Sequence, residues 1–285
     1  ISAPGTGGDP AQGLAKAVEM CNNNGSCRKF DAGTMCPSYR VTRDERHVTR
    51  GRANTLRLAL TGQLPAARNG ATGLAHPAVK ESLDLCVGCK GCKRECPTGV
   101  DMARMKIEVL HRHQQDHGLT LRQRLISYMP DYAHLASAMA PLLNLRDTVP
   151  GLAKLTEVVL GLSASRTLPR WHRKHFFNQL PPTVDRDTVL LAKKPVVLFV
   201  DTFNGYLESE VAHAAVRVLQ RGGYSVHVAS RDDGGKAHLC CGRTFLASGL
   251  VDQARAKMSE LIAHVAPFAK AGIAIVGLEP SCLLT

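Results

Sequence analysis

One stretch decides how the first part of this chain folds: Cys86-Val-Gly-Cys89-Lys-Gly-Cys92-Lys-Arg-Glu-Cys96-Pro97. Two residues between successive thiols let a short loop wrap one corner of a metal cluster. Gly88 and Gly91 let the backbone turn close to that cluster, and Pro97 suits the first turn of a following helix. The spacing C-x₂-C-x₂-C-x₃-C-P therefore predicts an iron–sulfur centre of the 4Fe-4S type.

The run supplies only three ligands to its own cluster. In two-cluster proteins with this spacing the fourth cysteine binds the other cluster, so Cys96 is expected to cross over. Cys36, which is followed by Pro37, provides the missing thiol. We therefore expect cluster I to be held by Cys86, Cys89, Cys92 and Cys36.

A second cluster is left open by the sequence. Cys21 and Cys27 occupy the first and third positions of another such run, but Asn24 stands where its second cysteine would be. Cys21, Cys27 and Cys96 are thus one thiolate short of a cubane. They predict a three-iron cluster, a cubane with another ligand near Asn24, or no cluster.

Zinc or buried thiols are the alternative interpretation of the central run. Zinc is usually bound by paired knuckles separated by a spacer, often with histidine, and the compact run fits this poorly. The ten cysteines are clustered along the chain rather than spread, which disfavours a disulfide framework. A reducing compartment and metal ligation are favoured.

Composition limits the function classes. The chain has 285 residues, 44% of them apolar, enough for about two domains. The net charge is +12 with only 5% aromatic residues, so an acidic protein domain or an anionic substrate is favoured over nucleic acid. No apolar run is long enough to span a membrane and no signal peptide is recognisable, so a cytoplasmic location is expected.

The first domain is expected over residues 13–125. Helices are predicted over 11–20, 53–60, 77–85 and 98–117, the last ending near Gly118. They form an α-helical ferredoxin-like scaffold rather than a small β-rich one. Arg50 and Arg52 either offset the charge of a cluster or are ordinary surface residues.

A helical connector is expected over residues 126–190, broken by prolines. Its run from Leu135 to Leu145 is amphipathic. Such an apolar stripe is expected to pack into a core; the alternative is a peripheral contact with the inner face of a membrane.

The last part, residues 191–285, changes pattern. Strands predicted over 196–200, 224–229 and 273–276 alternate with helices over 207–221 and 250–268, which indicates a small α/β domain with parallel strands. Ligands bind at the carboxyl ends of such strands. The thiols expected there are metal-binding, redox-active or merely small buried side chains: Cys240, Cys241 and Cys282.

Several motifs resemble known proteins in order and spacing. The central run, Cys36-Pro37 and the Cys240-Cys241-Gly242 turn resemble the iron–sulfur subunits of glycolate oxidase, anaerobic glycerol-3-phosphate dehydrogenase and heterodisulfide reductase. Closer similarity is to the C-terminal half of fused flavin/iron–sulfur dehydrogenases. It is carried by Met20-Cys-Asn-Asn-Asn-Gly, Gly33-Thr-Met-Cys-Pro-Ser-Tyr-Arg-Val-Thr, Arg50-Gly-Arg-Ala-Asn-Thr-Leu-Arg and Gly277-Leu-Glu-Pro-Ser-Cys.

This resemblance implies an FAD-binding domain of the vanillyl-alcohol-oxidase type on a part absent from the sequence, with residues 1–12 as the linker to it and a truncated C-terminus. It implies oxidation of a D-2-hydroxy acid, D-2-hydroxyglutarate or D-lactate, with electrons passing through 4Fe-4S clusters to a quinone, an electron-transferring flavoprotein or a cytochrome. Self-association is left open.

The resemblance also implies a cysteine-rich domain of the CCG type over residues 191–285, but the chain departs from its pattern. Thr202 and Glu279 stand where two of its cysteines are expected, which puts a noncubane cluster there in doubt. A heterodisulfide or thiol reductase with its active site at Cys240 and Cys241 is the alternative function. A non-redox protein in which the cluster only holds helices together is the third.

Overall fold

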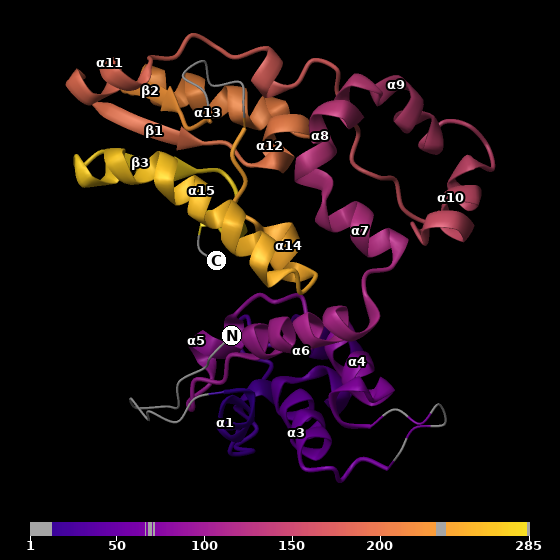
Figure 1. Cartoon of the computed structure of the whole chain (residues 1–285). Coiled ribbons are helices and arrows are strands. Elements are labelled where there is room, and N and C mark those ends of the chain that lie inside the picture. Colours follow the sequence, from indigo (N-terminus) through magenta and orange to yellow (C-terminus); the bar gives the residue numbers. More distant parts are fainter. Residues whose placement is uncertain (1–12, 66, 68–69, 71, 232–237, 284–285) are drawn as a thin grey trace. The chain divides into compact units, whose positions relative to one another are not determined.

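The computed structural model describes residues 13–65, 67, 70, 72–231 and 238–283. The chain divides into two compact units, residues 1–118 with 247–249 and residues 119–246 with 250–285 (Figure 1). Helices dominate both, and one three-stranded sheet lies in the second. Both units are described separately below.

The first unit is helical and has one core. α3 lies at its centre and packs against α1, α4 and α6. Val48, Leu56, Val79 and Val100 are completely buried there. Its elements are α1 (Leu14–Glu19), η2 (Ser26–Arg28), α2 (Pro37–Thr42), η3 (Glu45–His47), α3 (Thr49–Leu60), η4 (Gly73–Ala75), α4 (Pro77–Asp84), α5 (Gly91–Glu95) and α6 (Met102–His117).

The helices predicted in this unit are present, although residues 11 and 12 of the first lie outside the described residues and the one expected from residue 98 begins at Met102. α3 begins at Thr49, ahead of the expected residue 53. The early start depends on Gly51, because a Cβ atom there would lie 1.9 Å from the carbonyl oxygen of Glu45. Only glycine allows the preceding turn, η3, to pack directly on the first turn of α3.

The second unit contains a parallel sheet in the order β2-β1-β3, as the strand pattern predicts. Its elements are α7 (Leu121–Ser127), α8 (Met129–Ala138), α9 (Ala140–Leu143), η5 (Asn144–Asp147), α10 (Leu152–Leu160), η6 (Phe176–Asn178), α11 (Arg186–Leu191), β1 (Pro195–Phe199), α12 (Thr202–Tyr206), α13 (Ser209–Arg221), β2 (Ser225–Val228), α14 (Arg243–Ala247), α15 (Val251–Lys270), β3 (Ala274–Gly277) and α16 (Pro280–Leu283).

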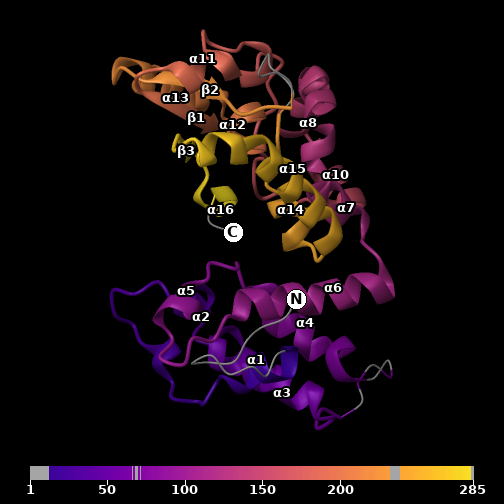
Figure 2. The ribbon, with the colours of Figure 1, turned by 60° about the vertical axis from the view of Figure 1, so that its left-hand side comes forward.

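Both faces of the central strand are covered. Side chains alternate between the faces of a strand, and in β1 Val196 and Leu198 pack against α13 and η6 while Val197 and Phe199 pack against α11 and α15. Figure 2 shows α11 and α13 near the strands and α15 beside β3. This two-sided burial explains the continuous apolar run of the strand.

The segment predicted as a helical connector lies in the second unit. α8 and η6 pack against α12, and Phe176 and Phe177 belong to the core of the sheet. The expectation that the apolar run from Leu135 to Leu145 packs into a core is wrong, because most of its large side chains are exposed. These are Leu135, Met139, Leu142, Leu143 and Leu145.

The coarse fold prediction is confirmed: the chain is mostly helical and carries a small parallel sheet. In the part of the chain that the structure describes, none of the helices has the length and apolar character needed to span a bilayer.

Candidate iron–sulfur site

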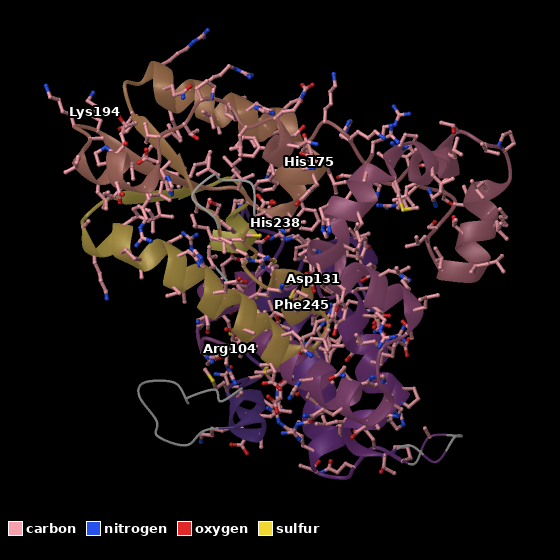
Figure 3. All side chains as sticks on the ribbon, turned by 45° about the horizontal axis from the view of Figure 1, so that its top comes forward. Arg104, Asp131, His175, Lys194, His238 and Phe245 are labelled. Atoms are coloured by element: carbon pink, nitrogen blue, oxygen red, sulfur yellow. The ribbon has the colours of Figure 1, made fainter. Side chains whose placement is uncertain are left out.

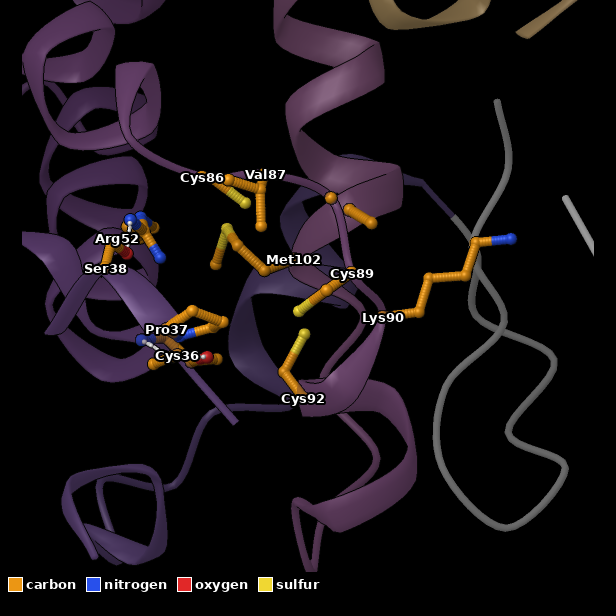
Figure 4. Close-up of a pocket in the computed structure, with 13 residues that line it drawn as sticks. Cys36, Pro37, Ser38, Arg52, Cys86, Val87, Cys89, Lys90, Cys92 and Met102 are labelled. Atoms are coloured by element: carbon orange, nitrogen blue, oxygen red, sulfur yellow. Dashed lines mark hydrogen bonds between the residues drawn. The ribbon is translucent and has the colours of Figure 1, made fainter. Parts of the chain in front are cut away.

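Four thiols line one pocket in the first unit. Cys36, the residue directly before α2, forms one part of its wall. Cys86 and Cys89 from the loop before α5, and Cys92 from the start of α5, form the rest of the thiol lining. Figure 4 shows the sulfurs of these three pointing into the space that Cys36 faces. Its described lining residues contain no histidine and no carboxylate. Four thiols without a competing imidazole or carboxylate are the donor set that iron–sulfur clusters use.

Cys36 is held in an unusual backbone conformation. Its φ is 52°, in the left-handed region, and it caps α2 directly before Pro37. The backbone N–H of Thr49 donates to the Cys36 Sγ over 3.1 Å, and the Thr49 hydroxyl lies 2.9 Å from the same sulfur. Thr49, the first residue of α3, therefore fixes the position of the Cys36 thiol. The spacing of the cysteines along the sequence predicts this thiol at the same site.

Burial keeps the Cys36 and Cys92 thiols protonated when no metal is bound. It raises the pKa of Cys92 to about 12 and also raises the pKa of Cys36. The backbone N–H of Met102 donates to the Cys92 sulfur and opposes part of the effect. Because metal ligands must be thiolates, cluster binding here has to displace protons.

Arg52 is not a surface residue: it is 2% exposed and lines the four-thiol pocket. Its Nε donates to the carbonyl oxygen of Ser82 over 2.8 Å, and its Nη2 donates to the Ser38 hydroxyl over 2.8 Å. No carboxylate is among these partners. A fixed positive charge of this kind favours an anionic ligand in the pocket, and its burial excludes the interpretation of Arg52 as an ordinary surface residue.

A second cation approaches the cysteine loop. Lys106 on α6 donates from Nζ to the carbonyl oxygen of Cys86 over 2.6 Å. Desolvation lowers the pKa of Lys106. The loop itself turns through left-handed backbone at Gly88 and Lys90, with φ of 65° and 58°.

Glu95 ties the two ligand segments together. Its Oε1 accepts from the backbone N–H of Thr34 over 2.7 Å and from the Thr34 hydroxyl over 2.6 Å, and its Oε2 accepts from the N–H of Met35 over 2.9 Å. These donors hold the pKa of Glu95 below its usual range. Gly33 allows the approach, because a Cβ there would lie 2.6 Å from the Glu95 carboxylate.

The Glu95→Gln substitution is expected to loosen this connection. An amide NH₂ group would face backbone donors that now meet a carboxylate oxygen, so the segment before Cys36 loses hydrogen bonds. We expect a lower thermal midpoint and roughly threefold faster release of iron to a chelator. Glu81→Gln, at an exposed glutamate that pairs with Arg46, is the matched control. Equal behaviour of both variants would show that Glu95 plays no part.

The second group of predicted ligands shares the same core. Cys21 and Cys27 are buried and Cys96 is half-buried. Burial raises the pKa of Cys27 to about 11, while the backbone N–H of Arg50 donates to its sulfur and lowers that pKa. Cys96 lies 3.2 Å from the hydroxyl of Thr98.

Asn24 is engaged within its own loop. It is exposed, and its Oδ1 accepts from the backbone N–H of Ser26 over 2.9 Å. Its Nδ2 donates to the Asn22 side chain over 2.7 Å. As arranged, the amide stabilises the turn between Cys21 and Cys27.

The third group of thiols lines a pocket in the second unit, at the carboxyl ends of the strands. Cys240, Cys241 and Cys282 are buried there beside Thr202 and the buried Asp201. Asp201 caps α12 by accepting from the N–H of Phe203 over 2.9 Å. β1 lies between β2 and β3, so the chain connections on its two sides run in opposite directions across the sheet. Ligands usually bind at this position, the carboxyl end of the central strand, in such sheets.

Contacts among these three thiols shift the pKa values of Cys240 and Cys241. The contact between Cys240 and Cys241 raises the pKa of Cys240, as does burial. The same contact lowers the pKa of Cys241, but the contact with Cys282 and burial outweigh it and raise that pKa to about 12. His238, which Figure 3 labels, lies nearby. Burial lowers its pKa to about 4, and its Nδ1 lies 3.1 Å from the Tyr206 hydroxyl. The Cys240 and Cys241 thiols and the His238 imidazole are therefore neutral at neutral pH.

Among the described residues, no three histidine, cysteine or acidic side chains are placed so that they could hold a single metal ion. Sequence reasoning missed Thr49, Glu95 and Lys106 because nothing in their spacing distinguishes them from surface residues. Only the tertiary structure places them beside the thiols.

Comparison with known proteins agrees with this geometry. Residues 17–100 match the family model described as a 4Fe-4S dicluster domain. D-2-hydroxyglutarate dehydrogenase of Escherichia coli (strain K12) is 24% identical over 302 residues, covering 93% of this chain and 29% of the relative. The enzymes of the same name from Pseudomonas putida and Haemophilus influenzae are 26% and 22% identical, covering 93% and 95% of this chain and 29% of each relative.

The chain thus spans 29% of the length of these relatives. No solved structure gives a significant match. The predicted resemblance to the iron–sulfur part of such dehydrogenases is confirmed. The chain carries a 4Fe-4S dicluster domain over residues 17–100, within a longer region of similarity to D-2-hydroxyglutarate dehydrogenases.

Proposed function

We propose that this chain is the electron-transfer part of an FAD-dependent D-2-hydroxy acid dehydrogenase. The observation that carries the proposal is the pocket lined by Cys36, Cys86, Cys89 and Cys92, which lies inside the segment that matches the 4Fe-4S dicluster domain. D-2-hydroxyglutarate is the favoured substrate because the similar proteins carry its name. D-lactate is the other candidate.

The pocket suits a 4Fe-4S cluster in donors and in charge. The four thiols would hold it as thiolates, and Arg52 and Lys106 offset its negative charge. When bound, such a cluster accepts and donates single electrons at a potential set by hydrogen bonds, burial and nearby charge. The residues of this chain thus provide four thiols, a buried cation and an N–H donor aimed at sulfur.

The proposed reaction removes two electrons and two protons from the 2-hydroxy acid and leaves a 2-oxo acid. Both electrons reach the flavin on a domain outside this sequence, and they leave one at a time through this chain to an acceptor. A quinone, an electron-transferring flavoprotein and a cytochrome are all compatible with that role.

For the second cluster of the dicluster domain, we propose Cys21, Cys27 and Cys96 as ligands. These three residues belong to the same core cluster as Cys36, Cys86 and Cys92, which supports this assignment. The local hydrogen bonds of Asn24 favour a three-iron cluster or an outside ligand over direct binding by its amide.

Thr49 is expected to tune the potential of the four-thiol site. In Thr49→Val the hydroxyl beside Cys36 is lost while the backbone N–H remains. A hydrogen bond to the ligand sulfur stabilises the reduced cluster, because that state carries more negative charge. Its loss should therefore lower the reduction potential by about 50 mV. Redox titration followed by EPR measures this shift. Thr49→Ser keeps the hydroxyl and should restore the potential; a Thr49→Val potential equal to wild type would refute the role.

The function is tested in the enzyme that contains this chain. Anaerobic addition of D-2-hydroxyglutarate or D-lactate should reduce flavin and iron centres together. In Cys92→Ser the flavin should still be reduced, whereas reduction of the acceptor should stop. Normal acceptor reduction in Cys92→Ser would contradict the proposal.

A second candidate function is a thiol or heterodisulfide reductase. It is favoured by the pocket in which Cys240, Cys241 and Cys282 meet at the strand ends. We propose this group as a redox site whose contribution is separable from the clusters. Cys240→Ala and Cys241→Ala test this role. If they abolish reduction of the acceptor while substrate still reduces the iron centres, electrons leave the protein through the thiol pocket. Unchanged rates of acceptor reduction would show that the pocket has no redox role.

A further inference from the structure

The second unit carries a preformed lobe with an apolar surface. The lobe comprises α9, η5, α10 and the segment up to residue 174, and Figure 1 shows α9 and α10 projecting beyond α8. α10 has no buried residue, and Val158 and Val159 on it are 78% and 60% exposed. Other large exposed apolar side chains of the lobe are Met139, Leu142, Leu143, Leu145, Val149 and Leu155.

One buried cation connects the segments of the lobe. Arg146 is 6% exposed and forms an ion pair with Asp147. Its Nη2 donates to the carbonyl oxygen of Ser163 over 2.7 Å, and its Nε donates to the Thr156 hydroxyl over 3.0 Å. The exposed apolar side chains are therefore displayed on an ordered scaffold rather than on a loose segment. A patch of this kind marks an interaction surface.

A basic segment runs along the same lobe. Asn144 exchanges two hydrogen bonds with the backbone of Trp171, and Arg173 donates to the carbonyl oxygen of Ala138 over 3.2 Å. Residues 161–175 contain no acidic residue. Their exposed cations are Arg166, Arg170, Arg173 and Lys174.

From this juxtaposition we propose that the lobe docks on an anionic lipid surface. A bilayer interface requires apolar side chains that protrude and cations that flank them, and it requires no matching shape. The lobe offers both on one ordered element. A second copy of the chain would bring two basic segments together at the same face, and like charges there oppose association.

The proposal goes beyond electron transfer and does not depend on it. Docking would place the chain where membrane-dissolved acceptors are found, but the contact itself uses only the side chains of the lobe. Its test therefore reads binding and not turnover, and its failure would leave the iron–sulfur assignment untouched.

The test is sedimentation of the purified, iron-loaded enzyme that contains this chain with vesicles of phosphatidylcholine containing about 30% phosphatidylglycerol. We expect binding that weakens with salt and falls roughly tenfold in Val158→Asp. Arg170→Glu or Arg173→Glu should weaken vesicle binding by about fivefold or more. Val218→Asp and Arg221→Glu, at exposed positions of α13, are the matched controls and should bind as wild type.

Three results would overturn the proposal. The first is no binding to these vesicles, and the second is equal loss in Val158→Asp and Val218→Asp. The third is a light-scattering mass that doubles for the wild type and returns to one chain in Val158→Asp without vesicle binding. That result would assign the lobe to self-association instead.

Discussion

Cys92→Ser is expected to remove the cluster at the four-thiol pocket. Serine keeps the size of the side chain but replaces the soft thiolate that iron–sulfur clusters require. Cys92 is buried in the pocket wall, so no water-exposed ligand can easily take its place. We expect loss of about half of the bound iron if two clusters are present, and a less stable first unit, because cluster binding contributes to folding.

Ala103→Ser is the matched control for this substitution. Ala103 lines the same pocket and is also buried, so the variant introduces the same hydroxyl while all four thiols remain. Its iron content should equal that of wild type. Full iron content in Cys92→Ser, measured after anaerobic purification, would remove Cys92 from the ligand set.

Gly51→Ala is expected to have the largest effect of any substitution at a residue that is not a ligand. The new Cβ would lie 1.9 Å from the Glu45 carbonyl oxygen and 2.8 Å from its carbonyl carbon. Backbone cannot yield as a side chain can, so η3 and α3 must separate. We expect a loss of about 3 kcal/mol or more in the free energy of unfolding, and iron loss as well, because the same turn carries Thr49 and Arg52.

Gly62→Ala tests whether overlap, and not glycine replacement in general, causes this loss. Gly62 has φ of 72° and no atom within 4 Å of a built Cβ. Its substitution should cost about 1 kcal/mol from backbone strain alone. Denaturant unfolding of both variants decides the matter: similar midpoints for Gly51→Ala and Gly62→Ala would mean that the contact with η3 is unimportant.

Much of the fold follows from local sequence signals. The three strands, the parallel sheet and the helices on either side of the cysteine run follow from periodicity, and the structure confirms them. The exposed lobe was mispredicted because an apolar stripe at helical spacing looks the same whether it faces a core or an outside surface. Only the tertiary contacts of α10 separate these cases.

The site shows the same division. Ligand spacing grouped Cys86, Cys89 and Cys92 and added Cys36 from far away in sequence, and the structure brings all four to one pocket. The sequence could not predict the contacts of the residues around these thiols. The burial of Arg52 and the hydrogen bonds of Glu95 depend on how α3, α4 and the loop before α2 pack together. Charge compensation is a property of that packing and not of any motif.

The central claim is that this chain holds 4Fe-4S clusters on its clustered thiols. Iron and acid-labile sulfide analysis of the anaerobically purified chain, with EPR before and after dithionite, tests it most directly. The account predicts at least about four irons and four sulfides per chain and a signal that appears on reduction; about eight would fill both sites. A chain that contains no sulfide, or that binds zinc in place of iron, would contradict it.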